Sequence, residues 1–183
     1  QGTGVSYEPE IIVKGNDKII PDNDFSPDET YSDGTYYGYV SVATGTISHT
    51  FTIVNQGGAD LNLTGTPLIE ISGTHNSDFT VTSQPASTIA SNGGTTEFTV
   101  QFNPNEIGHR NATVSIANDD IDKNPYEFAI MGTGIYIVAP QDSLALIALY
   151  ESTNGDEWKR NDNWKNRPVR DWYGVKVNFG VVT

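Results

Sequence analysis

The sequence predicts a mainly β protein, an antiparallel β-sandwich followed by a short helical segment rich in tryptophan. Two observations carry this prediction. Apolar and polar residues alternate along several stretches, which is typical of strands that bury one face. After Pro140 the apolar spacing becomes helical, and three tryptophans then follow within the 15 residues 158–172.

Four long stretches show the alternation most clearly. Their inward-facing sets are predicted to be Ile47, His49, Phe51 and Ile53; Phe98, Val100 and Phe102; Ala112, Val114 and Ile116; and Tyr126, Phe128 and Ile130. Shorter strands are predicted at or near residues 9–14, 35–40, 61–63, 68–72 and 78–82. Because Gly, Pro, Asn and Asp clusters separate the strands and leave no room for crossover helices, the sheets are expected to be antiparallel and packed as a sandwich.

Two segments depart from this pattern. Residues 16–34 are acidic, contain proline and show little periodicity, so they are predicted to form one long loop. Residues 142–155 carry Leu144, Ile147, Ala148 and Tyr150 at helical spacing, with Asp142 or Ser143 as the expected cap and Gly155 beyond the end. A last short strand is predicted at 172–178.

Composition narrows the function classes. The 23 acidic and 10 basic residues give a net charge of −13, which disfavours nucleic acid and anionic membrane surfaces as partners. The chain has no cysteine, so disulfides and thiolate zinc ligands are excluded. The sequence has no apolar run of about 18 residues, so membrane insertion is not expected.

An internal echo suggests where the domains begin and end. "QGTGV" at residues 1–5 matches "MGTGI" at residues 131–135, as expected for the closing strands of consecutive repeats. We therefore expect residues 1–4 to be the tail of a preceding repeat, 5–136 to be the sandwich and 137–183 to be a separate C-terminal segment.

The order of motifs in residues 5–134 resembles the choice-of-anchor D repeat of large bacterial surface and secreted proteins. These motifs are "F-x-I-x-N-x-G" from Phe51, "F-x-P-x-x-x-G" from Phe102 and the closing "GTG" at 132–134. That repeat is related to the ASPM, SPD-2 and Hydin group, whose domains are similar to major sperm protein. The resemblance implies an immunoglobulin-like β-sandwich, with tight turns at 55–58 and 104–108 in which glycine permits positive φ.

The C-terminal segment resembles the N-terminal cap of a bacterial leucine-rich repeat protein. The resemblance rests on "DSLALIALYESTNGDEW" at 142–158 and "WYGV" at 172–175. It implies that the helix and Trp158, Trp164 and Trp172 shield the end of a solenoid core. Since no leucine-rich repeat follows within the sequence, at least one of these tryptophans is expected to be exposed, or hidden by self-association or by docking on the sandwich.

No catalytic pattern is present, so the chain is predicted not to be an enzyme. The H-E-x-x-H, G-x-S-x-G and phosphate-loop motifs are missing, as are paired catalytic carboxylates. His49 is expected to be a hydrogen-bonded histidine of the apolar face, whereas His75 and His109 are assigned to solvent.

Calcium is the one cofactor that the sequence leaves open. Asp22, Asp24, Asp28 and Glu29 form one group of oxygen ligands on a predicted loop, and Asp119, Asp120 and Asp122 form a second. Neither group has EF-hand spacing, and solvated acidic loops with Asp side chains capping turns are the alternative. No other cofactor is expected.

The predicted function is that of a non-catalytic spacer and presentation module in a large exported bacterial protein, extracellular or on the cell surface. Its partner would be a protein or glycan bound through leucine-rich repeats, with self-association through the cap as a further possibility. The alternative is an accessory or carbohydrate-binding domain of a secreted multidomain hydrolase, since the tyrosines of "YSDGTYYGY" at 31–39 could form an aromatic platform for sugars.

Overall fold

The computed structural model describes residues 7–30, 32–42, 44–136, 138, 140–178 and 181–182. The predicted tail at 1–4 lies outside these residues. The chain divides into two compact units, Gln1–Ile135 and Tyr136–Thr183, which we call the sandwich unit and the C-terminal unit. The division falls one residue before the boundary expected from the sequence.

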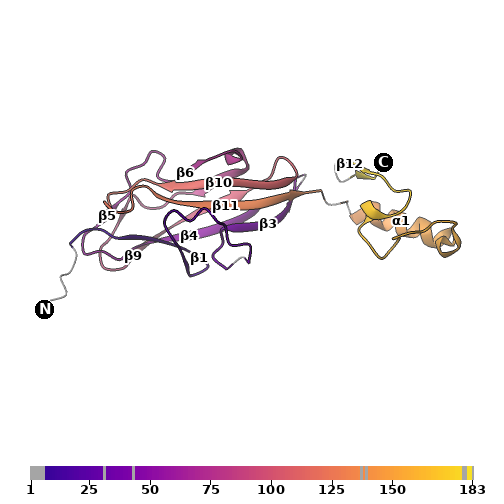
Figure 1. Cartoon of the computed structure of the whole chain (residues 1–183), viewed down its shortest axis with the longest axis horizontal. Helices are drawn as coiled ribbons and strands as arrows, with labels where there is room; N and C mark the ends of the chain where they lie inside the picture. The colour runs from indigo at the N-terminus through magenta and orange to yellow at the C-terminus, as the bar shows by residue number, and fades with distance from the viewer. Residues whose placement is uncertain are drawn as a thin grey trace. The chain divides into compact units, whose positions relative to one another are not determined.

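Two main β-sheets form the sandwich unit (Figure 1). The first has the strand order β2-β1-β4-β9-β7 and contains β1 (Ile11–Gly15), β2 (Lys18–Ile20), β4 (Ile47–Asn55), β7 (Phe79–Ser83) and β9 (Gly94–Phe102). The second has the order β3-β11-β10-β6 and contains β3 (Tyr36–Ser41), β6 (Glu70–Ser72), β10 (Gly108–Ile116) and β11 (Tyr126–Ile135). A small pair, β5 (Leu61–Asn62) with β8 (Thr88–Ile89), and the 3-10 turn η1 (Asn76–Asp78) complete the unit.

The core between the sheets confirms the predicted alternation. All three inward residues predicted for each of β9, β10 and β11 are buried. In β4, Phe51 and Ile53 are fully buried, but His49 is half-buried and Ile47 is 37% exposed; β1 pairs with β4 only over Phe51–Asn55. Phe51 contacts Phe98 and Phe128, at ring centroid distances of 5.3 and 5.5 Å, so aromatic packing joins the two sheets.

The prediction of a single loop over 16–34 is wrong at its beginning. β2 pairs with β1 as a hairpin whose two-residue turn is Asn16 and Asp17, with φ values of 48° and 63°. Positive φ at both positions is the geometry that matches the twist of a hairpin, and Asn and Asp tolerate it. β2 buries only Ile20, and one inward residue is too few to produce a visible period.

The prediction of wholly antiparallel sheets is also wrong at one place. β3 runs parallel to β11, with a register shift between Met131 and Thr133. β3 and β11 are separated in the sequence by residues 42–125, so no tight turn forces them to run in opposite directions. Before β3 begins, the segment after β2 already lies beside β11: Asn23 N–H donates to Glu127 O at 2.7 Å, and Ala129 N–H donates to Asp24 O at 2.8 Å.

The two predicted glycine turns need glycine for different reasons. Gly108 has φ of 98°, as expected. In the 55–58 turn neither glycine has positive φ. Gly57 is instead required by close approach, because a Cβ there would overlap the carbonyl oxygen of Glu8.

The C-terminal unit consists of one helix and short irregular elements. These are α1 (Pro140–Ser152), the 3-10 turns η2 (Gly155–Glu157) and η3 (Val169–Asp171), and the pair β12 (Val177–Asn178) and β13 (Val181–Val182). The helix begins at Pro140, so Asp142 and Ser143 lie in its first turn and not at the cap. No helix in the described part of the chain is long and apolar enough to span a bilayer.

The core of the C-terminal unit is aromatic. Tyr150, Trp164, Val169 and Trp172 are buried, with Leu146, Ile147 and Trp158 packed against them. The predicted apolar face of the helix is partly wrong, because Leu144 is 64% exposed and Ala148 is exposed. Ile147 and Tyr150 pack inward as predicted, and Leu146 takes an inward position that was not predicted.

The expectation of exposed or externally covered tryptophans is wrong for Trp164 and Trp172. Their relative exposures are 6% and 5%, and their ring centroids are 4.7 Å apart. Trp164 also stacks on Tyr150 at 5.2 Å. Trp164 Nε1–H donates to Tyr173 O at 3.0 Å and Trp172 Nε1–H to Arg167 O at 2.6 Å, so the unit itself satisfies both indoles.

Candidate functional site

The first predicted calcium group lies on the segment between β2 and β3. Its carboxylates accept hydrogen bonds from nearby backbone: Asp22 Oδ1 from Glu127 N–H at 2.8 Å, and Asp24 Oδ1 from Ser26 N–H at 2.9 Å. Glu29 is exposed. Asp22 thus ties the segment to β11, and Asp24 shapes a local turn.

Asp28 has the most strongly hydrogen-bonded carboxylate of this group. Oδ1 accepts from Thr30 N–H at 2.9 Å and from the Thr30 hydroxyl at 2.6 Å, and Oδ2 accepts from the Ser32 hydroxyl. The Ser32 hydroxyl, followed by the two Thr30 donors, lowers the pKa of Asp28 from 3.8 to about 2, because these bonds favour the charged form. The carboxylate holds the loop in a turn.

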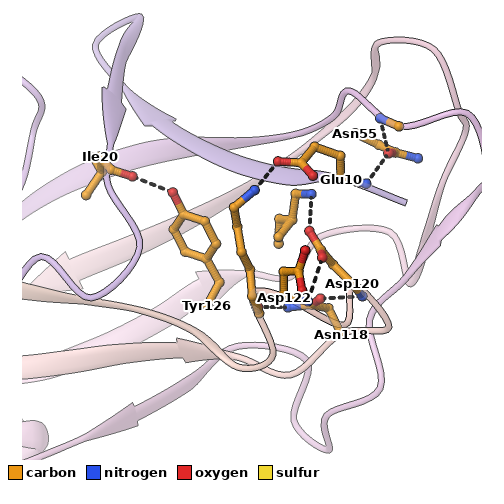
Figure 2. A network of polar contacts seen from close by, with 10 residues as sticks. Glu10, Ile20, Asn55, Asn118, Asp120, Asp122 and Tyr126 are labelled. Atoms are coloured by element: carbon orange, nitrogen blue, oxygen red, sulfur yellow. Dashed lines mark hydrogen bonds and ion pairs between the residues drawn. The ribbon is translucent and has the colours of Figure 1, made fainter. Parts of the chain in front are cut away.

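The second predicted group joins the start of β1 to the loop between β10 and β11 (Figure 2). Asp120 is buried, and its Oδ2 accepts from the backbone N–H of Ile11 at 2.9 Å, across 109 residues of sequence. Its Oδ1 accepts from Asp122 N–H at 3.1 Å. Asp119 is exposed and holds Asn62, accepting from its backbone N–H and from its side-chain amide, both at 2.8 Å.

Asn118 and Asn55 extend this network, and sequence reasoning missed both. Asn118 is buried: its side-chain amide donates to Ile116 O and Lys123 O, both at 2.9 Å, while its Oδ1 accepts from Asp120 N–H at 2.8 Å. Asn55 is fully buried, and its Oδ1 accepts from Gly57 N–H at 3.0 Å. The signal available in the sequence was an asparagine directly before a Gly-rich or Asp-rich turn.

Tyr126 belongs to the same end of the sandwich. Its hydroxyl donates to Ile20 O at 2.5 Å, which fixes the hairpin strand that the sequence did not predict (Figure 2). Burial raises the pKa of Tyr126 to about 12. Lys123 forms an ion pair with Glu10 beside it.

The structure does not gather either acidic group around one point. Among the described residues, no three His, Asp or Glu side chains lie together as a metal ion would require. In the same residues, every buried side-chain nitrogen or oxygen has a hydrogen-bond partner. Calcium binding stays a prediction, and calorimetric titration of the full chain with Ca²⁺ tests it.

The three histidines lie apart and contact different strands. His49 stacks on Tyr37 with ring centroids 4.2 Å apart, and its Nδ1 lies 2.7 Å from Gly34 O. His75 Nδ1 lies 2.8 Å from Asn111 Oδ1, and this ring is half-buried and not fully in solvent as expected. His109 is exposed.

The predicted tyrosine platform for sugars does not form as a group. Tyr36 and Tyr37 are 5% and 1% exposed, and Tyr37 belongs to the core between the sheets, whereas Tyr39 is 66% exposed. Tyr31 lies outside the described residues. Among the described tyrosines of this run only Tyr39 is exposed, so at this place the carbohydrate hypothesis loses its aromatic surface.

A buried ion pair lies on the sandwich where no functional residue was predicted. Arg110 Nε on β10 is 2.5 Å from Asp78 Oδ2 on η1, and the Asp78 side chain has no solvent exposure. Arg110 Nη2 also donates to Asn105 Oδ1 at 2.9 Å. The pair fixes the 104–108 turn against η1, which is a structural role.

Two sheets packed face to face, with Asn- and Gly-rich turns between the strands, define the sandwich unit as an immunoglobulin-like domain. The sequence family described as "HYDIN/CFA65/VesB-like, Ig-like domain" matches residues 38–133. This match covers 96 of the 183 residues, and the chain belongs to that family. No match was found among curated proteins.

Several solved structures share parts of this arrangement. A protein of unknown function from Porphyromonas gingivalis W83 is 14% identical, with a TM-score of 0.47. The match covers 72% of this chain and 50% of the length of that protein. The secreted serine protease VesC from Vibrio cholerae is 19% identical with a TM-score of 0.43, covering 62% of this chain and 24% of its own. The VesB protease of Vibrio cholerae is 18% identical with a TM-score of 0.39, covering 54% and 29%.

The chain therefore spans half or less of the length of each of these proteins. The family match concerns the sandwich alone. The finer resemblance to a choice-of-anchor D repeat and the leucine-rich-repeat cap remain predictions.

Proposed function

We propose that this chain is a non-catalytic spacer and presentation module of a large exported bacterial protein, extracellular or on the cell surface. One observation carries the proposal: buried carboxylates of the sandwich are engaged in holding it together. Asp120 bonds the β1 backbone, and Asp78 pairs with Arg110. Family membership supports an immunoglobulin-like domain, a fold that commonly serves as a rigid unit within longer chains.

In this proposal the C-terminal unit is the cap of a leucine-rich repeat solenoid, which binds a protein or glycan partner. The aromatic core supports this role, because a solenoid end needs an atypical unit with its own packed interior. Leu144, 64% exposed on the outer side of α1, offers apolar surface to a neighbouring element.

A replacement experiment in the parent protein tests the spacer role. Deleting residues 5–135 should abolish partner binding or surface display, whereas replacing them with an unrelated immunoglobulin-like domain of similar length should restore it. A spacer is defined by length and stiffness and not by surface chemistry. If the replacement fails while the protein is still exported, the sandwich surface itself makes a specific contact and the proposal is wrong.

A second candidate is an accessory domain of a secreted hydrolase. The family description names VesB, and one solved structure is described as the VesB protease, which is the observation that favours it. Removing the sandwich unit from the parent should then weaken substrate binding and leave turnover of a small soluble substrate unchanged. A parent protein without hydrolytic activity would eliminate this candidate.

A further inference from the structure

A groove of about 360 Å³ lies in the C-terminal unit, and no sequence feature predicted it. Its wall is apolar and aromatic, with Leu146 and Leu149 from α1, the Trp158 ring, and Tyr173. Leu149 is 50% exposed and Tyr173 is 46% exposed, so the wall is open to a ligand. This size and lining are typical of small-molecule sites.

Arg160 lines one side of the groove, and Asp162, which does not line it, pairs with Arg160 from beside it. The Arg160 guanidinium lies over the Tyr173 ring, 4.0 Å from its centroid. Arg160 Nε and Nη2 are each 3.1 Å from the same oxygen, Asp162 Oδ2. The backbone N–H of Tyr173 donates to the backbone oxygen of Asp162 at 3.1 Å, which holds the three residues together.

This pair has hydrogen-bonding capacity left over. Both contacts of Arg160 go to one carboxylate oxygen, so Asp162 Oδ1 and Arg160 Nη1 have no partner among the described residues. A guanidinium presents its donors in a rigid plane, and stacking on Tyr173 fixes that plane. Arg160 in the groove and Asp162 beside it therefore offer a donor and an acceptor next to an apolar wall.

That combination selects the ligand class. A wholly apolar ligand would cover the charged pair without satisfying it, which is costly. A charged ligand gains little, since Arg160 and Asp162 compensate each other. A pyranose has an apolar face for an aromatic or leucine wall, and neighbouring hydroxyls that both donate and accept hydrogen bonds.

We propose that this groove binds a neutral saccharide, with one sugar face against Trp158 and Leu149 and adjacent hydroxyls bonded to Arg160 and Asp162. The site goes beyond the spacer role and does not depend on it. It places glycan recognition on the C-terminal unit, where the partly exposed Leu149 and Tyr173 line a groove, and not on the tyrosines of β3.

The test uses the full chain on an array of neutral oligosaccharides ending in glucose, galactose, mannose or N-acetylhexosamine, with calorimetry on each hit. Arg160→Ala and Asp162→Asn should each weaken binding about tenfold, the size expected when a ligand loses a hydrogen bond to a charged group. Leu149→Ala should weaken binding by a smaller factor. All three side chains are largely exposed, so the variants should fold, and their tryptophan emission checks this.

Tyr39→Ala is the matched control, because Tyr39 is an exposed aromatic on the sandwich unit, and its affinity should equal that of the unchanged chain. A blank array together with no saturation transfer at millimolar sugar would overturn the proposal. The proposal would also be overturned if Arg160→Ala and Asp162→Asn bound sugar as tightly as the unchanged chain. Concentration-dependent association without sugar, lost in those variants, would assign the groove to a second copy of the chain instead.

Discussion

The two units of this chain differ in charge and in the way they fill their interiors. The sandwich unit carries 17 acidic and 4 basic residues, a net charge of −13, whereas the C-terminal unit carries 6 of each. Among the described residues, 21 buried apolar side chains form the sandwich core and only four form the other. All of the net charge therefore belongs to the unit with the large core.

This difference indicates a division of labour. A large core tolerates self-repulsion between surface carboxylates, and net charge keeps a module soluble. The C-terminal unit combines a small aromatic core with an open groove, a balance typical of units stabilised by a neighbour or a ligand. We therefore expect the sandwich to provide stability and the C-terminal unit to provide contact.

All three tryptophans lie in the C-terminal unit, which makes the comparison measurable. Tryptophan fluorescence reports on that unit alone, while the strand signal in circular dichroism reports mainly on the sandwich. Denaturation followed by both probes should give two separate transitions, with the tryptophan transition first.

The largest effect is expected from Phe51→Ala in the sandwich core. Phe51 has no exposure and contacts Phe98 and Phe128, so its removal leaves a cavity between the sheets. The free energy of unfolding of the sandwich should fall by about 3–5 kcal/mol in denaturant titration. The tryptophan transition should not move, and a parallel shift in both transitions would show that the two units unfold as one.

Arg110→Ala should follow, at about 3 kcal/mol, because it leaves the carboxylate of Asp78 buried without its partner. The same denaturant titration measures this loss. The double variant Arg110→Met with Asp78→Leu is the control, since an apolar pair of similar volume removes the uncompensated charge. If the double variant is no more stable than the single one, the ion pair is not the reason for the loss.

Asp120→Ala should destabilise the sandwich by about 2 kcal/mol, because the backbone N–H of Ile11 loses its buried acceptor. Asp119→Ala, at an exposed carboxylate of the same loop, should cost less than about 1 kcal/mol. Thermal melts followed by circular dichroism compare the two. Equal losses would mean that the loop and not the buried bond sets the stability.

The smallest effect concerns pH. The folded pKa of Asp28, about 2, lies below the ordinary value of 3.8 for an aspartate, so its hydrogen bonds stabilise the loop fully above pH 3.8 and are lost as pH falls toward 2. A carboxyl NMR titration should give a midpoint near 2. Ser32→Ala should raise it, because Ser32 is the largest cause of the shift, and an unchanged midpoint in that variant would contradict the assignment.

The strands with the longest alternation were the most predictable part of the fold. β9, β10 and β11 each bury the three residues that the period of two indicates. β2 was missed because its hairpin depends on two positive φ values at Asn16 and Asp17 and on a single buried side chain. The parallel direction of β3 was missed because it depends on the path of a long segment, which local spacing does not encode.

The candidate site residues were less predictable than the fold. The sequence indicated Asp120 as a candidate metal ligand. Only the structure shows that its carboxylate accepts a hydrogen bond from the backbone N–H of Ile11. Arg160, Asp162 and Tyr173 are near in sequence, yet nothing in their spacing indicates that a guanidinium stacks on a ring. Contacts of this kind depend on side-chain conformation and not on periodicity.

The edge strands of the two sheets are short or irregular, which affects how readily the domain aggregates. β2 and β6 have three residues each, and the pairings of β7 and β3 with their neighbours break register, at Val81/Ser83 and at Met131/Thr133. Short or irregular rims are poor templates for an incoming strand. Many copies of this domain could therefore be crowded together without joining into a continuous fibre.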